Sequence, residues 1–309
     1  MNWAADNGTM RWSWLLSFLL VLPGMTIAAA ARGEDDLTIS SAVQMAQPGA
    51  VVLIVVACRE PPDRVVATAL GREVAFYPDP DGKTWRGLVG VDLESWPGEY
   101  ALTVEAIRDG RPALTVTHQL RVTSRQFPTR RLRVAASYVN PPASALDRIR
   151  RESERLVNIF RSVTPRRWDG PFVMPVDDRL TSNFGARSIF NGQPRNPHVG
   201  IDFMSPEGAP VRAPNAGQIA LAEDLFFTGN TVIVDHGLGL YSLFAHLSRL
   251  DVEQGEAVEP GAALGLVGAT GRATGPHLHW AVRLSGARVD PLSLIAAVKA
   301  LAASQADRR

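Results

Sequence analysis

The sequence predicts a mainly β protein in three parts: an N-terminal β-sandwich, a helical connector and a C-terminal antiparallel β domain. Three observations predict this order. Short β-branched runs alternate with Pro-Gly and Asp-Gly turns over residues 35–125, and one stretch of helical periodicity lies between prolines over 141–165. Residues 168–305 are again rich in strand-like runs and in glycine. We therefore expect the chain to divide into these three ranges.

The N-terminus has the features of a secretory signal, which we assign to residues 1–31. Arg11 precedes an apolar run over 12–22, and small residues suited to cleavage follow at 28–31. An uncleaved membrane anchor is the alternative, although Pro23-Gly24 interrupts the run and favours cleavage. The net charge of +1 gives no reason to expect a nucleic-acid partner. We predict export to the periplasm or cell envelope, with membrane attachment only if the segment stays uncleaved.

Residues 35–125 have strand-like runs at the spacing of an immunoglobulin-type sandwich. Turn pairs such as Pro48-Gly49 and Asp81-Gly82 separate short apolar runs such as Ala50–Val56 and Trp85–Val89. Cys58 is the only cysteine, so an intramolecular disulfide is excluded and a buried strand position is expected. Because no catalytic residue types cluster here, we interpret this part as a spacer or as a docking module for another envelope protein.

The connector, residues 141–165, has the pattern of one amphipathic helix. Pro141-Pro142 ends the preceding chain, Ser144 is the expected cap, and the helix is expected from Ala145 to Val163. Apolar residues recur at helical spacing, with Arg and Glu on the other face. Two interpretations stay open. The helix either links the two β parts or packs on the groove of the C-terminal part and shields it.

Five of the six histidines lie in the C-terminal part. His198 and Asp202 form one motif, His277 and His279 form another, and His246 lies between them. Along a strand, alternate side chains share a face, so His277 and His279 can enter one site. Neutral imidazole and carboxylate suit Zn²⁺, and a catalytic zinc takes three protein ligands and one water. Two histidines then remain for proton transfer, which indicates a hydrolase. His236 precedes a tight turn, and we interpret it as structural.

Residues from about 180 to 282 resemble the lysostaphin-type (LytM-like) zinc endopeptidases of peptidoglycan. The resemblance depends on His198-Val-Gly-Ile-Asp202, Ala245-His-Leu247 and Thr270-Gly-Arg-Ala-Thr-Gly-Pro-His-Leu-His279, among other segments. It implies one Zn²⁺ bound by His198, Asp202 and His279, with His246 and His277 as the catalytic pair. Relatives often have tyrosine two positions before the middle histidine, whereas this chain has Phe244.

The implied activity is zinc-dependent cleavage of peptide cross-links in peptidoglycan. We assign His277 as the general base, because it shares a strand with the ligand His279, and His246 as the oxyanion partner. The alternative is a non-catalytic LytM-like activator that binds a cell-wall amidase. Such activators have lost zinc ligands, whereas all three are present here.

Overall fold

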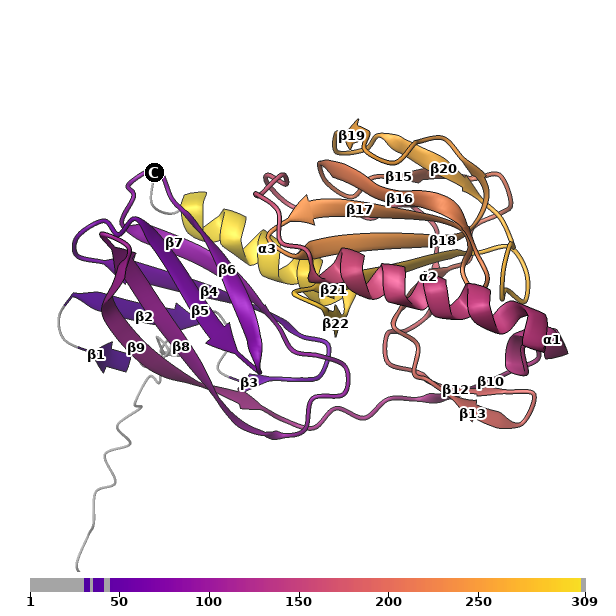
Figure 1. Ribbon diagram of the computed structural model, residues 1–309, viewed down its shortest axis with the longest axis horizontal. Coiled ribbons are helices and arrows are strands. Elements are labelled where there is room, and N and C mark those ends of the chain that lie inside the picture. The colour runs from indigo at the N-terminus through magenta and orange to yellow at the C-terminus, as the bar shows by residue number, and fades with distance from the viewer. Residues whose placement is uncertain (1–30, 34–35, 42–44, 307–309) are drawn as a thin grey trace, which may run out of the picture.

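The computed structural model describes residues 31–33, 36–41 and 45–306, and it is mainly β, as predicted (Figure 1). The described N-terminal strands are β1 (Ala31–Gly33), β2 (Leu37–Ser41), β3 (Met45–Ala46), β4 (Val51–Cys58), β5 (Arg64–Ala69), β6 (Arg72–Pro78), β7 (Thr84–Gly90), β8 (Gly98–Arg108) and β9 (Arg111–Val122). They pair in the order β1-β2-β4-β7-β6-β5-β8-β9-β3. The predicted signal, residues 1–31, lies outside the described residues except for Ala31.

The N-terminal sheet folds into two halves that enclose one core, and β6 belongs to both halves. Its first residues pair with β5, and Phe76–Pro78 pair with β7. Alternate side chains of β4 and β8, such as Ile54 and Val104, are fully buried between the halves. Cys58 is buried at the end of β4, as expected. The assignment of this part to the immunoglobulin class stays a prediction.

Between the N-terminal strands and the C-terminal sheet lie β10 (Thr129–Leu132), α1 (Ala136–Val139) and α2 (Ala143–Arg161), of which only α2 falls within the predicted connector. α2 corresponds to the predicted helix, but it starts and ends two residues earlier. The predicted cap at Ser144 is wrong, because Pro142 precedes the first helical residue and Ser144 lies inside the helix. The pyrrolidine ring fixes φ of Pro142 at −65°, and its carbonyl accepts a hydrogen bond from the Ala145 amide at 2.9 Å. The chain therefore enters the helix without a side-chain cap.

The C-terminal part is built around one antiparallel sheet with the order β11-β14-β21-β18-β17-β16-β19. Its described elements are β11 (Leu180–Ser182), β12 (Arg187–Phe190), β13 (Gln193–Arg195), β14 (Gly200–Phe203), β15 (Pro210–Arg212), β16 (Gly217–Leu225), β17 (Gly229–Gly237), β18 (Leu240–Leu250), β19 (Ala257–Val258), β20 (Ala263–Val267), β21 (Leu278–Leu284), β22 (Ala287–Val289) and α3 (Pro291–Ala306). β10 pairs in parallel with β12, and β13 completes this small sheet. A strand from before the connector helix is therefore part of the C-terminal unit.

α2 packs on the main C-terminal sheet and not on the N-terminal strands (Figure 1). Phe160 is buried against Tyr241, with ring centroids 5.7 Å apart, and it shares an apolar cluster with Ala281 on β21. The Arg148 guanidinium bonds to Asp224 at 2.9 Å. Ala281 and His279 are two residues apart on β21, so the helix covers the sheet face that also carries His279.

The N-terminal strands pack against β22 and α3 of the C-terminal part. The Val51 amide donates to the Ser293 hydroxyl at 2.9 Å, and Arg288 pairs with the buried Asp92. Hydrogen bonds from Arg288 outweigh the effect of burial and lower the pKa of Asp92 to about 2. A Cβ on Gly90 would lie 3.1 Å from both Ala287 and Val289, so the two parts are in close contact there. The N-terminal part is therefore fixed on the C-terminal part.

No helix in the described part of the chain has the length and apolar character needed to cross a membrane.

Candidate metal centre and groove

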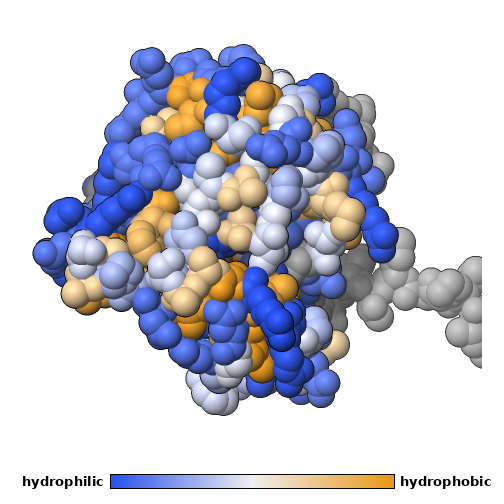
Figure 2. Space-filling model, turned by 90° about the vertical axis from the view of Figure 1, so that its right-hand side faces the viewer, coloured by the Kyte–Doolittle hydropathy of each residue, from blue (hydrophilic) through white to orange (hydrophobic). Residues whose placement is uncertain are grey.

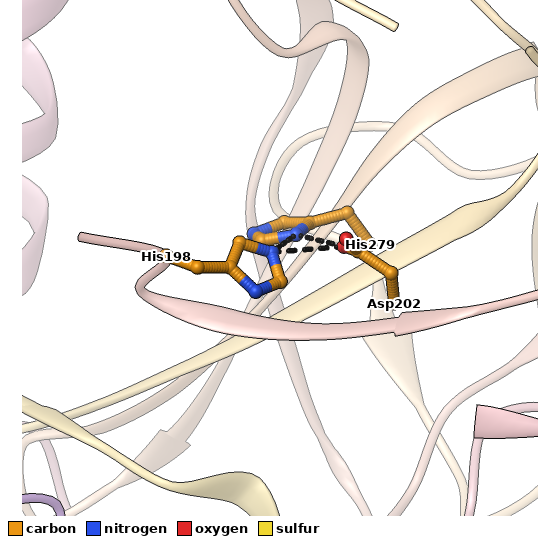
Figure 3. Close-up of side chains that lie close together, drawn as sticks. All are labelled: His198, Asp202 and His279. Carbon is orange, nitrogen blue, oxygen red and sulfur yellow. Dashed lines mark hydrogen bonds and ion pairs between the residues drawn. The ribbon is translucent and has the colours of Figure 1, made fainter. Parts of the chain in front are cut away.

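His198, Asp202 and His279 converge on one point, as Figure 3 shows. Nε2 of His198 lies 2.9 Å from Oδ1 of Asp202 and 2.9 Å from Nδ1 of His279, and that Nδ1 lies 2.8 Å from the same Oδ1. All three residues are buried. Asp202 and His279 are direct cross-strand partners on β14 and β21, and His198 lies just before β14. The sheet register therefore brings together residues that lie 77 positions apart in the chain.

The donor set fits a divalent cation such as Zn²⁺. Nδ1–H of His198 donates to the Asn183 carbonyl at 3.2 Å, so Nε2 directs its lone pair at the Asp202 carboxylate. Two acceptor atoms at 2.9 Å repel each other unless a positive charge lies between them. Two imidazoles and one carboxylate around one point form a ligand set that zinc takes in proteins.

The Asp202 carboxylate is ionised and is held on both oxygens. Burial opposes its ionisation, but interactions with the adjacent His198 and His279 rings outweigh burial and keep the pKa of Asp202 well below its usual range. Its second oxygen, Oδ2, accepts a hydrogen bond from Nη1 of Arg130 on β10 at 3.0 Å. Nε of the same arginine donates to Ser188 on β12 at 3.0 Å. β10 therefore orients one of the three converging side chains.

Gly200 permits the close approach of β14 to β21. A Cβ at this position would lie 2.4 Å from the Trp280 carbonyl oxygen and 2.8 Å from Cε1 of His279. Any side chain would therefore displace the histidine or the strand that carries it. This packing therefore requires glycine at the third position of the His198-Val-Gly-Ile-Asp202 motif.

His246 and His277 form a second pair beside the three converging residues. Their ring centroids are 4.8 Å apart, and the His246 ring lies 6.1 Å from that of His279. Each Nδ1 lies 2.8 Å from a backbone carbonyl, that of Thr270 for His246 and that of Gly275 for His277, so each Nδ1 carries the proton. Each Nε2 is then left with a lone pair. Burial is the main cause that lowers the pKa of His246 to about 3.

The backbone of His246 adopts a left-handed conformation. His246 has φ of 66°, which is uncommon for a residue other than glycine, and its amide donates to the Thr228 carbonyl at 2.8 Å. Phe244, two residues before, is buried on the other face of β18 and stacks on Trp280. Phe244, which stands where relatives often have tyrosine, therefore contributes an apolar ring to the core.

The five predicted site residues line one groove of about 510 Å³. Strand β10 contributes Arg130 and Leu132 to its wall, and the loop before β21 contributes Arg272. No residue of α2 lines the groove in the described part of the chain, so the helix lies beside it. His236 lies outside the groove, where it contacts the Ala216 carbonyl at 2.8 Å.

The two groove arginines were not among the predicted site residues. Arg130 precedes the region of family resemblance, and only the pairing of β10 with β12 shows its position. Arg272 lies inside the Thr270-Gly-Arg-Ala-Thr-Gly segment, where its charge in a glycine-rich loop was the available signal.

Comparison with known proteins identifies the family. The model of peptidase family M23 matches residues 196–291. The chain is 41% identical over 116 residues to the DD-carboxypeptidase/endopeptidase Mpg of Neisseria meningitidis serogroup B, a match that covers 38% of this chain and 27% of that protein. It is 37% identical over 121 residues to the peptidoglycan DD-endopeptidase ShyA of Vibrio cholerae, covering 38% of this chain and 28% of that protein. The chain thus spans about a quarter of the length of these curated relatives.

The similarity to one solved structure extends over most of the chain. A crystal structure assigned to peptidase M23 from Pseudomonas aeruginosa is 37% identical and superposes with a TM-score of 0.64. The match covers 81% of this chain and 95% of that one, so it includes residues outside the family model. This chain belongs to peptidase family M23.

Proposed function

We propose that this protein is a zinc-dependent endopeptidase that hydrolyses peptide cross-links of bacterial peptidoglycan. The observation that carries the proposal is the convergence of His198, Asp202 and His279 on one point within a groove, with His246 and His277 beside them. Membership of family M23 supports peptide-bond hydrolysis, and relatives named as peptidoglycan DD-endopeptidases support the substrate class.

His198, Asp202 and His279 would hold one Zn²⁺. When bound, zinc supplies a Lewis acid that polarises the scissile carbonyl and lowers the pKa of water. Arg130 keeps Oδ2 of Asp202 occupied, which leaves Oδ1 directed at the two imidazoles. The carbonyl of Asn183 fixes the tautomer of His198 in the same way that a hydrogen-bonded partner orients other metal-binding histidines.

His277 would move the proton that hydrolysis requires, with His246 beside it. Because both Nδ1 atoms donate to backbone carbonyls, each Nε2 has a lone pair, and that of His277 can accept a proton from the attacking water and pass it to the leaving amine. The assignment of His277 as the base is compatible with this arrangement. The low pKa of His246 keeps its ring neutral, and a neutral ring with Nδ1 protonated has no Nε2 proton to donate to an oxyanion. We therefore propose that His246 accepts hydrogen bonds from water or substrate.

Export to the periplasm or cell envelope would bring the enzyme to its substrate, with the predicted signal over residues 1–31 as the targeting segment. The N-terminal β part packs closely against β22 and α3, which favours a role as a rigid part of the enzyme. A further envelope protein could still dock on its outward strands.

Digestion of purified peptidoglycan by the mature protein tests the proposal, with the His277→Ala variant as the control. Mass analysis should show cross-linked dimers converted to monomers whose sugar–peptide bond is intact, together with new amino groups and no new reducing ends. Release of reducing sugar would exclude an endopeptidase. Absence of any product, combined with stimulation of an added cell-wall amidase, would instead support the activator alternative.

A further inference from the structure

We propose that Arg272 is a carboxylate-binding residue that selects substrates with a free carboxylate near the scissile bond. The inference rests on the proposed peptidase function and names a substrate feature that the metal centre and histidine pair do not determine. Arg272 lies in the loop before β21 and lines the same groove as His246 and His277.

Two aromatic rings hold the Arg272 guanidinium in the groove. Its Cζ lies 4.8 Å from the ring centroid of Phe227 and 5.0 Å from that of Phe190. The Arg272 amide also donates to the Phe227 carbonyl at 2.8 Å. Ring contacts do not use up the N–H groups of a guanidinium, and a carboxylate can accept two of them.

The groove has too little negative charge to balance its arginines. Asp202 is the only acidic residue among those that line it, and Asp202 already contacts two histidines and Arg130. In the part of the chain that the structure describes, no acidic residue pairs with Arg272. Burial is the main cause that lowers the pKa of Arg272, and the positive charges of Arg130 and Arg195 add to it. A bound carboxylate would relieve this excess of positive charge.

The loop that contains Arg272 also orients the catalytic pair. The Thr270 carbonyl accepts the Nδ1 proton of His246, and Thr270 is two residues before Arg272. The Thr228 carbonyl, which accepts the His246 amide, directly follows Phe227. A carboxylate on Arg272 would therefore belong to a substrate residue close to the bond that faces His246.

The surface at this end of the molecule agrees with a polar ligand. In Figure 2, which looks onto the end that carries α1, hydrophilic residues dominate and hydrophobic ones form separate groups.

Stem peptides offer the carboxylate from two sources: a side chain beside the scissile bond or the C-terminus of the stem. Both present the same pair of oxygens to a guanidinium.

Kinetics with four matched cross-linked peptides distinguish the two sources of the carboxylate. In these peptides the side-chain carboxylate and the C-terminal carboxylate are each either free or amidated. For Arg272→Gln we expect KM on the peptide with the recognised carboxylate to rise about 10- to 100-fold with kcat nearly unchanged, because a charge-assisted hydrogen bond in the bound ground state is lost. The corresponding amidated peptide should show the same KM for wild type and variant. Arg272→Lys should recover part of the loss, and Arg131→Gln, an exposed neighbour of the groove on β10, should behave as wild type.

Binding of the cleaved product peptide, measured by calorimetry, gives a readout that does not require turnover. Arg272→Gln should weaken binding of the free-carboxylate product by the same factor, with zinc content and thermal stability as in wild type. Equal binding of free and amidated products by wild type would overturn the proposal. Selective product binding without hydrolysis would instead contradict the proposed enzymatic function and leave the carboxylate site intact.

Discussion

Gly200 lies where β14 and β21 approach most closely, and Gly200→Ala is expected to destroy the metal centre. The added Cβ would lie 2.4 Å from the Trp280 carbonyl oxygen. Ordinary contact requires about 3.4 Å, so the strands must separate by roughly 1 Å, whereas metal–ligand distances tolerate only about 0.2 Å. Because Asp202 and His279 are cross-strand partners on these two strands, the displacement separates two of the three converging side chains.

Zinc affinity, measured by competition with a chromophoric chelator, is the assay for this variant. We expect a loss of at least 100-fold in affinity, together with about 1–3 kcal/mol of destabilisation from overpacking. The matched control is Gly98→Ala on β8, where an added Cβ meets only Tyr100 at 3.7 Å. Wild-type zinc affinity in Gly200→Ala would refute the reasoning that this close approach sets the ligand geometry.

Two further outcomes concern stability. Phe160→Ala should lower the free energy of unfolding by about 3–5 kcal/mol, because α2 buries this ring on the main C-terminal sheet. Val157→Ala, on the exposed side of the helix, should cost far less, and equal effects would mean that α2 does not stabilise the sheet. Burial is the main cause that lowers the pKa of His236 to about 4, so the unfolded chain takes up a proton below about pH 6.5 while the folded protein does not. Protonation of His236 in the unfolded chain should therefore lower the free energy of unfolding by about 3 kcal/mol as the pH falls from 6.5 to 4. His236→Gln should flatten that part of the curve of unfolding free energy against pH. Parallel curves for wild type and variant would contradict this prediction.

Local patterns were sufficient for the elements that lie close together in the sequence. The β-branched runs correspond to β4, β5, β7, β8 and β9, and the apolar periodicity corresponds to α2. His277 and His279 both line one groove, but the expected shared strand is wrong, because β21 begins at Leu278 and His277 forms an isolated bridge with Gly268. These predictions depend on side-chain alternation and periodicity, which a single segment determines by itself.

Features set by contacts between distant segments were not predictable in the same way. The parallel pairing of β10 with β12, which brings Arg130 to Asp202, joins strands more than fifty residues apart. The cap at Ser144 was predicted wrongly because Pro142 already sets the start of the helix. The place where α2 packs depends on the sheet it meets, since an apolar stripe shows only that a helix face will be buried.

Zinc content after dialysis tests the central claim most directly, because it separates residues that bind the metal from residues that lie beside it. We predict about one Zn²⁺ per chain in wild type and in His277→Ala, and almost none in His279→Ala, with hydrolysis lost in both variants. Equal loss of zinc in the two variants would contradict the assignment of His198, Asp202 and His279 as the metal ligands.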